Sequence, residues 1–585
     1  MDNSVLIKKV YNKSLVFSML MIIPASLASI IDTIFIGMLV GPVGTAAYGL
    51  VMPTTLIINA LSLMLGNGGI TLYLDHVGKG EKGQADSNFT MIFLVSLVVS
   101  VALAALGFFG ADAIIAGLGA KGDKAYLLPD GAAYMRGIML SVVPTMICGS
   151  VDRYVRMDGG DKLVLAGTLG MGISNAVLDY VLGSSMGMWG IGLATFCCYL
   201  VYLAILCLHL LQKENHLRFV RPMGWARELG RATRSGSASA AMRICQAAGM
   251  IITNVIILGY GAENLAGATI RNSVAALFIF LSMGLEMATM LLAGMFYGER
   301  DEGELVKLLK KSVSTELVMM VILAAAVYVF ARPFASIFTH DEQVLEVSVV
   351  ALRWYAVFLP TGVLAETLQY VYQGVHNNLM ANFICVMSDL VLFVPAALIM
   401  TGAMGVLGYW VAPLVANLTL LVIVFLIVSI HGRKIPRTAG DWLMLRPDFA
   451  SGLKAVWSFS IGDNSQDVVR ISQALQDFCR ENGVDERRSY KIALAAEEMA
   501  DNIVEHAFKT SGGNYIDMCA QIKDDGDVTL RIRDNGRGFN PIAYVGELSD
   551  DGDISSNIGI KMTQKIVKDM DYRYIGGLNN LLLTI

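Results

Sequence analysis

The chain has 585 residues, of which 55% are hydrophobic and 16% charged, and its mean hydropathy is +0.58. This composition excludes an ordinary soluble protein, and a formal net charge of -5 gives no reason to expect a nucleic-acid partner. Counting along the sequence, the first 450 residues hold 29 basic and 28 acidic residues, whereas the last 135 hold 15 and 21. The charge density roughly doubles, which predicts a membrane domain followed by a more polar domain.

Twelve apolar runs in the first part are long enough, on the order of 20 residues each, to cross a bilayer. They lie at roughly 14 to 38, 47 to 74, 89 to 110, 132 to 151, 163 to 183, 188 to 212, 238 to 259, 266 to 297, 313 to 331, 349 to 374, 381 to 401 and 405 to 430. Because twelve is an even number, both termini are expected on the same side of the membrane.

Basic residues gather in alternate loops between these runs, and the intervening loops are short and nearly uncharged. They are Lys8, Lys9, Lys13, Lys79, Lys82, Arg153, Arg156, Lys162, Arg218, Arg221, Arg227, Arg231, Arg234, Lys307, Lys310, Lys311, Arg433, Lys434 and Arg437. Such a bias places the basic loops inside the cell. We therefore expect a multi-pass protein of the cell membrane, in contact with lipid, with both termini in the cytoplasm.

The two sets of six runs resemble diverged copies. The segment SNAVLDYVLGSSMGMWGIGLAT in the first set is similar to SDLVLFVPAALIMTGAMGVLGYW in the second, with Gly187 and Gly190 corresponding to Gly405 and Gly408. Simple glycine packing between helices would explain the glycines but not the polar residues placed with them. The repeat predicts two lobes around a central site and alternating access.

Three polar side chains in the first set mark a candidate ion site. A carboxylate in a spanning helix costs about 2.5 to 3.5 kcal/mol on insertion scales, so Asp32 and Asp179 should face a cavity, a partner or an ion. Asn175 lies one helical turn before Asp179 and shares its face. Together the three side chains could bind H⁺ or Na⁺, although each could instead be a structural hydrogen-bond partner between helices.

Several motifs in order give residues 10 to 430 a family resemblance. They read IPASLASIIDTIFIGMLVGPVGTAAYGLVMP, LGNGGITLYLDHVGKGEKGQAD, SNAVLDYVLGSSMGMWGIGLAT and AGMFYGERDEGEL. They resemble the multidrug and toxic compound extrusion (MATE) family of secondary transporters. The resemblance implies transport of small organic compounds and a cation site at Asp32, Asn175, Asp179 and Thr195.

Charged residues also lie within or beside apolar runs of the second set. They are Arg243, Arg271, Glu286, Arg353, Glu366 and Asp389. The arginines could pair with the carboxylates internally or bind an anionic group of a substrate. Because familiar members of the resembled family export organic cations, three such arginines leave the substrate class open.

The remaining chain predicts a linker and a compact α/β domain. Residues 433 to 454 contain Pro436 and Pro447 without sustained periodicity, which is typical of a connector. From residue 455, AVWSFSI, YIDMCAQI, VTLRIR, YRYIG and NLLLTI read as strands, and three helical patterns lie among them. KDDGD between two of the strands predicts a hairpin turn.

A candidate nucleotide site without a P-loop lies in this domain. Glu498, Asn502 and His506 recur every four residues, which places them on one face of a helix. His506 could form a wall of this site, or it could be a structural histidine on the helix face. The sequence DNGRG at 534 to 538 follows a strand, and its glycines allow the backbone to pass close to a flat ligand.

The two motifs together resemble the Bergerat-fold ATPases, which include histidine-kinase catalytic domains and the anti-sigma-factor serine kinases. The resemblance implies ATP and Mg²⁺ as cofactors. It makes Asn502 the Mg²⁺ ligand, Glu498 the candidate general base, and Asp534 the acceptor of the adenine amino group. Since ATP is cytoplasmic, it also agrees with the charge bias of the loops.

The glycines of this resemblance are incomplete. Gly536 and Gly538 match the second motif, but SSNIGIKM stands where G-x-G-L-G is expected. Only Gly559 remains there, with Ser556 and Asn557 as substitutes. The helix that begins at this point could still offer backbone amides to a phosphate.

The resemblance also bears on activity. No neighbouring segment provides a phosphoacceptor histidine in a dimerisation hairpin, so a complete sensor histidine kinase is not expected. The compact form resembles the serine kinases more, which implies ATP-dependent phosphorylation of a separate cytoplasmic antagonist protein.

These observations predict a polytopic helical membrane protein with an α/β sandwich head. The expected parts are residues 1–215 and 216–432 as two MATE-like lobes, 433–454 as linker and 455–585 as the ATP-binding head. The first hypothesis is an H⁺- or Na⁺-coupled antiporter of organic, chiefly cationic, compounds with a regulatory or kinase-like head. The alternative is a ligand-sensing receptor that controls a serine kinase. ATP-driven transport ranks last, because the chain has no Walker A sequence.

Overall fold

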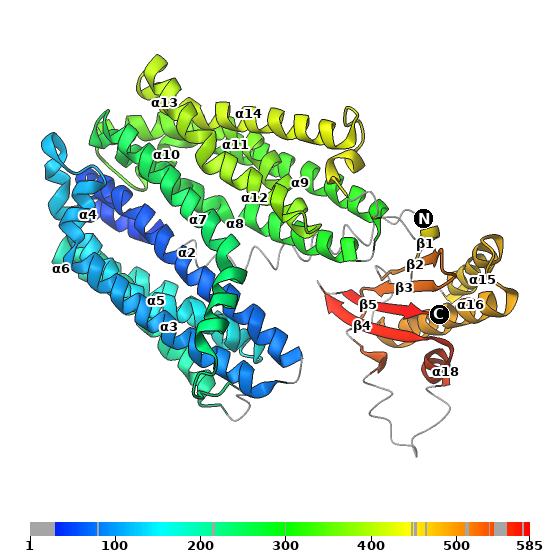
Figure 1. Cartoon of the computed structure of the whole chain (residues 1–585). Coiled ribbons are helices and arrows are strands. Elements are labelled where there is room, and N and C mark those ends of the chain that lie inside the picture. Colours follow the sequence, from blue (N-terminus) through cyan, green and yellow to red (C-terminus); the bar gives the residue numbers. More distant parts are fainter. Residues whose placement is uncertain are drawn as a thin grey trace.

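A computed structural model shows a long helical bundle followed by a smaller domain with one sheet, which we call the head (Figure 1). The structure describes residues 30–78, 81–212, 217–298, 300–445, 449, 453–462, 465–508, 514–537, 539–542, 558–575 and 578–585.

The bundle consists of long helices joined by short turns. In the first half they are Ile30–Leu39, α2 (Pro42–Gly78), α3 (Lys82–Phe109), α4 (Ala111–Gly117), α5 (Leu128–Met157) and α6 (Asp161–Leu210). In the second half they are α7 (Trp225–Leu258), α8 (Ala262–Gly298), α9 (Glu302–Val329), α10 (Ala331–Ser336), α11 (Glu342–Gly374), α12 (Asn378–Val386), α13 (Phe393–Met404) and α14 (Val406–Gly432).

Within the described residues, ten helices are long and apolar enough to cross a membrane. One of them, α6, combines two expected spans, because its backbone leaves helical geometry at Gly187. The short apolar helix Ile30–Leu39 is the described end of the first expected span. The architecture therefore agrees with the twelve spans expected from the apolar runs.

The break in α6 has a counterpart between α13 and α14. Gly187 has φ 58° and ψ -137°, and Gly405 has φ 62° and ψ -145°. This region of backbone space is essentially restricted to glycine. Three residues after each break another glycine lies so close to the preceding helix that a Cβ would overlap a backbone oxygen, that of Leu182 for Gly190 and that of Met400 for Gly408. The same turn thus occurs in both halves, as the aligned glycines predict.

Large apolar side chains cover the outside of the bundle. Val98 on α3 is 67% exposed, Ile173 on α6 is 68% exposed, and Ile322 on α9 is 65% exposed. Apolar exposure on this scale is unfavourable in water but favourable against lipid. The exposed helix faces therefore provide the lipid contact that the composition predicts.

The two halves meet along α2 and α7. A Cβ at Gly68 would overlap the Ala232 backbone, and a Cβ at Gly236 would overlap the Met64 backbone. Farther along, Asn254 Nδ2 donates to the Gly49 oxygen at 2.9 Å. Small residues at such crossings let two helices approach closely in a membrane.

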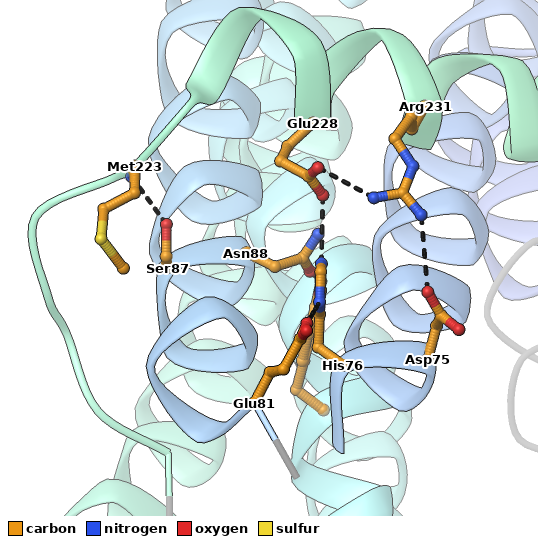
Figure 2. Close-up of polar contacts among 9 residues, drawn as sticks. Asp75, His76, Glu81, Ser87, Asn88, Met223, Glu228 and Arg231 are labelled. Carbon is orange, nitrogen blue, oxygen red and sulfur yellow. Dashed lines mark hydrogen bonds and ion pairs between the residues drawn. The ribbon is translucent and has the colours of Figure 1, made fainter. Parts of the chain in front are cut away.

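Polar contacts fix the beginning of α7 to the end of α2 (Figure 2). The buried His76 ring lies between Glu81, with 2.8 Å from Nδ1 to Oε2, and Glu228, with 3.2 Å from Nε2 to Oε2. Arg231 joins the other Glu228 oxygen at 2.9 Å to Asp75 at 3.4 Å. The first two turns of α7 are thereby held on the first half of the bundle.

The connector between the two halves is also attached. The Met223 amide donates to Ser87 Oγ at 2.8 Å, as Figure 2 shows, and the Val220 amide donates to Thr90 Oγ1 at 3.0 Å. Both acceptors lie in the early turns of α3. Side chains of the first half therefore satisfy backbone groups of the connector, which helps to order it.

The head is an antiparallel five-stranded sheet in the order β1-β2-β3-β5-β4. Its elements are β1 (Leu453–Ile461), α15 (Ser465–Glu481), α16 (Glu486–Asn502), β2 (Ile516–Lys523), β3 (Val528–Asp534), α18 (Ile558–Ile566), β4 (Asp569–Ile575) and β5 (Leu578–Thr584). The hairpin expected at KDDGD joins β2 and β3, with Gly526 at φ 86°.

Alternation along the strands divides the sheet into two faces. Met518, Ala520, Leu530 and Ile532 form the inner face and pack in one core with α15 and α16. In Figure 1 the sheet lies between these two helices and the bundle. The head is thus an α/β sandwich, as expected.

Candidate functional sites

The three polar residues expected in the first half do come together inside the bundle. Asn175 Nδ2 donates to Asp32 Oδ1 at 3.1 Å and to Asp179 Oδ2 at 2.9 Å. One amide nitrogen of Asn175 thus bridges the two carboxyl groups. Asp179 is completely buried, Asp32 is 7% exposed and Asn175 is 3% exposed.

This geometry favours a proton or a cation. Two carboxylates bridged by one amide group in a low-dielectric interior are strongly disfavoured when both are ionised without compensation. Within the described residues, Asp179 Oδ1 is buried and accepts no hydrogen bond. A proton or a hard cation on this pair would satisfy the charge and the open acceptor together.

The described contacts do not join Thr195 to these three residues. Thr195 lies on α6 beyond the break at Gly187, and its hydroxyl donates to the Ile191 oxygen of its own helix at 3.3 Å. The polar group inside the bundle therefore consists of Asp32, Asn175 and Asp179.

Three arginines that the sequence places within or beside apolar runs of the second half, Arg243, Arg271 and Arg353, form no ion pair with a carboxylate in the part of the chain that the structure describes. Arg243 donates to Gln246 at 2.8 Å, Arg271 donates to Asn272 at 2.7 Å, and the Arg353 guanidinium lies 5.6 Å from the centre of the Tyr328 ring. Arg271 also lines a cavity of about 190 Å³ together with Glu366 and Asp389. This cavity presents charges of both signs.

The expected nucleotide site coincides with a cavity of about 360 Å³ in the head. Its walls are Met499, Asn502, Ile503, His506, Ala507, Asp534, Arg537, Phe539, Pro541, Ile560, Tyr572, Asn579 and Leu581. The lining is mainly apolar, with a few polar groups at fixed positions, which is typical of a small-molecule site.

Asp534 ends β3 at the floor of this cavity and is 3% exposed. Its Oδ1 accepts from the Gly536 amide at 2.8 Å and from Asn579 Nδ2 at 2.7 Å. Burial raises the pKa of Asp534 to about 6, although these two donors favour the charged form. Both donors bind Oδ1 of this cavity-lining carboxyl group.

Glu498 and Asn502 lie next to the start of α18, and Asn502, but not Glu498, lines the cavity. A Cβ on Gly559 would overlap the Glu498 carboxylate and would lie 3.3 Å from Asn502 Nδ2. Glycine is therefore the residue that lets α18 approach this pair. Burial, followed by the charges of Asp501 and Glu497, raises the pKa of Glu498.

The helix that carries Glu498 and Asn502 does not continue regularly to His506, as a simple spacing of four residues would require. After Asn502 the chain makes a π-helical turn at Ile503–Ala507, and such turns shift the register of a helix. His506 still lines the cavity, but it is exposed and lies 3.9 Å from Glu505. Gly536 is closely packed, since a Cβ there would lie 2.7 Å from the Ala507 Cβ. Gly538, Ser556 and Asn557 lie outside the described residues.

Comparison with protein families decides the class of the bundle. The MatE family model matches residues 16–181 and 238–399, which is more than half of the chain. The chain belongs to the MatE family. The model of the histidine kinase-like ATPase domain matches residues 463–585, so this MatE protein carries a C-terminal domain of that type and is a multi-pass membrane protein.

Individual relatives agree with this assignment. The MatE chain is 24% identical over 447 residues to the multidrug export protein MepA of Staphylococcus saprophyticus, covering 71% of this chain and 95% of MepA. It is 25% identical over 350 residues to an FAD transporter of Shewanella oneidensis, covering 57% and 74%. A solved inward-facing multidrug resistance MATE transporter matches with a TM-score of 0.64 at 22% identity, over 70% of this chain and 96% of that one.

Some lining residues of the MatE protein's head were not expected. Asn579 holds Asp534 and also accepts from the Tyr572 hydroxyl at 2.7 Å and from the Phe539 amide at 3.3 Å. The strand NLLLTI contained the signal, because Leu581 and Leu583 point into the core and Asn579 has the same parity. A polar side chain on a core-facing position requires a partner.

Proposed function

We propose that this MatE protein is an H⁺- or Na⁺-coupled antiporter of small organic compounds, chiefly cations. The observation that carries the proposal is the buried contact of Asn175 with both Asp32 and Asp179. The pair changes its electrostatic balance when a proton or Na⁺ enters or leaves. Export of drugs by MepA supports the substrate class, and the basic loops support an orientation with both termini in the cytoplasm.

We propose that the head binds Mg²⁺-ATP and regulates transport. Asp534 would accept the adenine amino group. The carboxamide oxygen of Asn502 would be the Mg²⁺ ligand, since Asn502 Nδ2 donates to the backbone carbonyl oxygen of Glu498 at 2.6 Å. Gly536, Gly538 and Gly559 would let the backbone approach the nucleotide. Glu498 would act as general base in hydrolysis or in transfer of a phosphoryl group to a serine of a cytoplasmic partner.

The described side chains fit such a cofactor. A flat purine matches the apolar walls around Asp534, where Met499, Ile560 and Leu581 contribute apolar surface. Bound ATP would supply the phosphoryl chemistry. The chain itself supplies orientation through Asp534 and a proton acceptor at Glu498, whose raised pKa suits that role.

Transport is tested in proteoliposomes without ATP, with uptake of the fluorescent cation ethidium driven by an imposed H⁺ or Na⁺ gradient. Asp179→Asn removes the buried charge and should lower gradient-driven uptake at least about tenfold, as loss of a required charged group does. Asp112→Asn is the matched control, because Asp112 is an exposed partner of Arg136. No uptake by the wild type under either gradient would contradict transport and favour the ligand-sensing receptor.

A further inference from the structure

The outer face of the head's sheet is buried, although the helices of the head cover only the inner face. On β2 and β3, Asp517 is 4% exposed, Cys519 1%, Arg531 3% and Arg533 2%. An antiparallel sheet with helices on one face ordinarily leaves its other face to water. Here the turn between α8 and α9 of the bundle lies against that face.

One ion pair joins the sheet to this turn. Arg531 donates through Nη1 to Asp301 Oδ2 at 3.1 Å and through Nη2 to Asp517 Oδ2 at 3.0 Å. Asp301 is also the N-cap of α9, since its Oδ1 accepts from the Glu304 amide at 3.0 Å. Removal of one acceptor from a buried guanidinium leaves its charge poorly compensated, which is strongly destabilising.

A second arginine of β3 contacts the end of α8. The Arg533 guanidinium lies 4.9 Å from the centre of the Phe296 ring, a cation–π distance. The Arg533 Nη1 atom is also 3.9 Å from Asp517. Both outward-pointing arginines of β3 therefore contact the bundle, and both also lie near Asp517.

The two elements at this joint each lead to a cavity. The strand β3 ends at Asp534, the residue after Arg533, on the floor of the nucleotide cavity. The helix α8 lines a cavity of about 290 Å³ in the bundle with Asn272 and Ser282. From Ser282 to Phe296 the helix rises by about 21 Å at 1.5 Å per residue. One strand and one helix thus connect the cavities through the joint.

We infer that the outer face of the sheet is a docking surface for the α8–α9 turn, and that nucleotide binding at Asp534 stabilises this docking. The nucleotide part rests on the proposed function of the head. A ligand on Asp534 restrains the end of β3, so the strand loses its outer contacts less often. Thermodynamic linkage is reciprocal. A change of the bundle that opens the joint should therefore weaken nucleotide binding by the same factor by which the nucleotide stabilises the docked state.

The joint is tested in the full-length protein in nanodiscs by the rate at which N-ethylmaleimide labels Cys519, measured by peptide mass spectrometry. Asp301→Asn keeps an N-cap but removes the charge that Arg531 faces. It should accelerate labelling about tenfold or more. Asp341→Asn is the matched control, because Asp341 caps α11 in the same manner, with its Oδ1 3.0 Å from the Val344 amide. Cys479, buried in the core of the head, reports unfolding and should keep its rate.

The linkage is tested with Mg²⁺ and the fluorescent analogue mant-ATP. Saturating probe should slow Cys519 labelling about fivefold in the wild type and leave Asp534→Asn unchanged. Wild-type labelling rates in Asp301→Asn would overturn the docking surface. Unchanged Cys519 labelling with the probe bound would overturn the linkage and leave the nucleotide site standing. Absence of probe binding would overturn the nucleotide site and the linkage, while the Asp301→Asn comparison would still decide the docking.

Discussion

At the residue scale, the head's candidate site depends on how one carboxyl group is held. Asp534 is buried beside an apolar wall, which disfavours its charge, and two donors on Oδ1 partly compensate. Asn579 is one of these donors and is itself fixed by Tyr572. Asn579 is therefore a positioning residue for Asp534.

This balance predicts a pH dependence of nucleotide binding. With a pKa of about 6, Asp534 is ionised at pH 7.5 and can accept from an adenine amino group, whereas about nine tenths is protonated at pH 5. The affinity of the full-length protein for mant-ATP should therefore fall about tenfold from pH 7.5 to pH 5. In Asn579→Leu a donor to the charged form is lost, so the pKa rises and the midpoint should move to higher pH.

Titration of the nucleotide itself affects the wild type and Asn579→Leu alike, so a difference between their midpoints reports the pKa of Asp534. Equal midpoints in the wild type and in Asn579→Leu would contradict the positioning role.

At the element scale, each half of the bundle has one turn where two spanning helices meet without a loop. Gly187 and Gly405 adopt the same backbone conformation, and Gly190 and Gly408 then pack on the preceding helix. The aligned glycines predict the repeat from the sequence. The gap between the expected spans 163 to 183 and 188 to 212 also predicts the break, but it does not predict that the two spans join without a loop within the 50 residues of α6.

Substitution at this turn should destabilise the bundle. In Gly405→Ala a side chain enters a positive-φ conformation, which costs about 1 to 3 kcal/mol. Thermal unfolding in detergent should show a lower midpoint than for the wild type. Gly402→Ala is the matched control in α13, because Gly402 is helical and a Cβ there meets no atom within 4 Å. Equal midpoints for the two variants would show that the strain at Gly405 is not important.

At the scale of the whole molecule, the head and the bundle are joined by a buried polar contact as well as by the linker. The carboxylates proposed for ion coupling lie in the first half, whereas the head docks on α8 and α9 of the second half. This separation fits a head that modulates the bundle and is not its energy source.

A truncated chain distinguishes these roles. A protein that ends after Leu445 should still take up ethidium under an ion gradient, and Mg²⁺-ATP in the cytoplasmic compartment should no longer change its rate. Uptake by the full-length and truncated proteins in proteoliposomes, with size-exclusion profiles as the control for folding, measures this. Loss of gradient-driven uptake in a well-folded truncated protein would contradict a purely regulatory head.

The sequence by itself determined the elements whose signal is local. Apolar length predicts the spans, parity predicts the strands of the head, and the spacing of Glu498, Asn502 and Asp534 indicates the nucleotide site. A carboxylate in an apolar run, such as Asp32 or Asp179, is visible because its insertion cost requires an explanation.

Only the tertiary structure decided which charged and polar residues far apart in the chain contact each other. Asp32 and Asp179 are separated by 147 positions, yet one Asn175 side chain joins them. Arg531 and Asp301 carry no local pattern that relates them, and their pairing follows from the docking of the sheet on the α8–α9 turn. Periodicity indicates which face of an element is polar, but the partner of that face depends on packing, which brings together residues far apart in the chain.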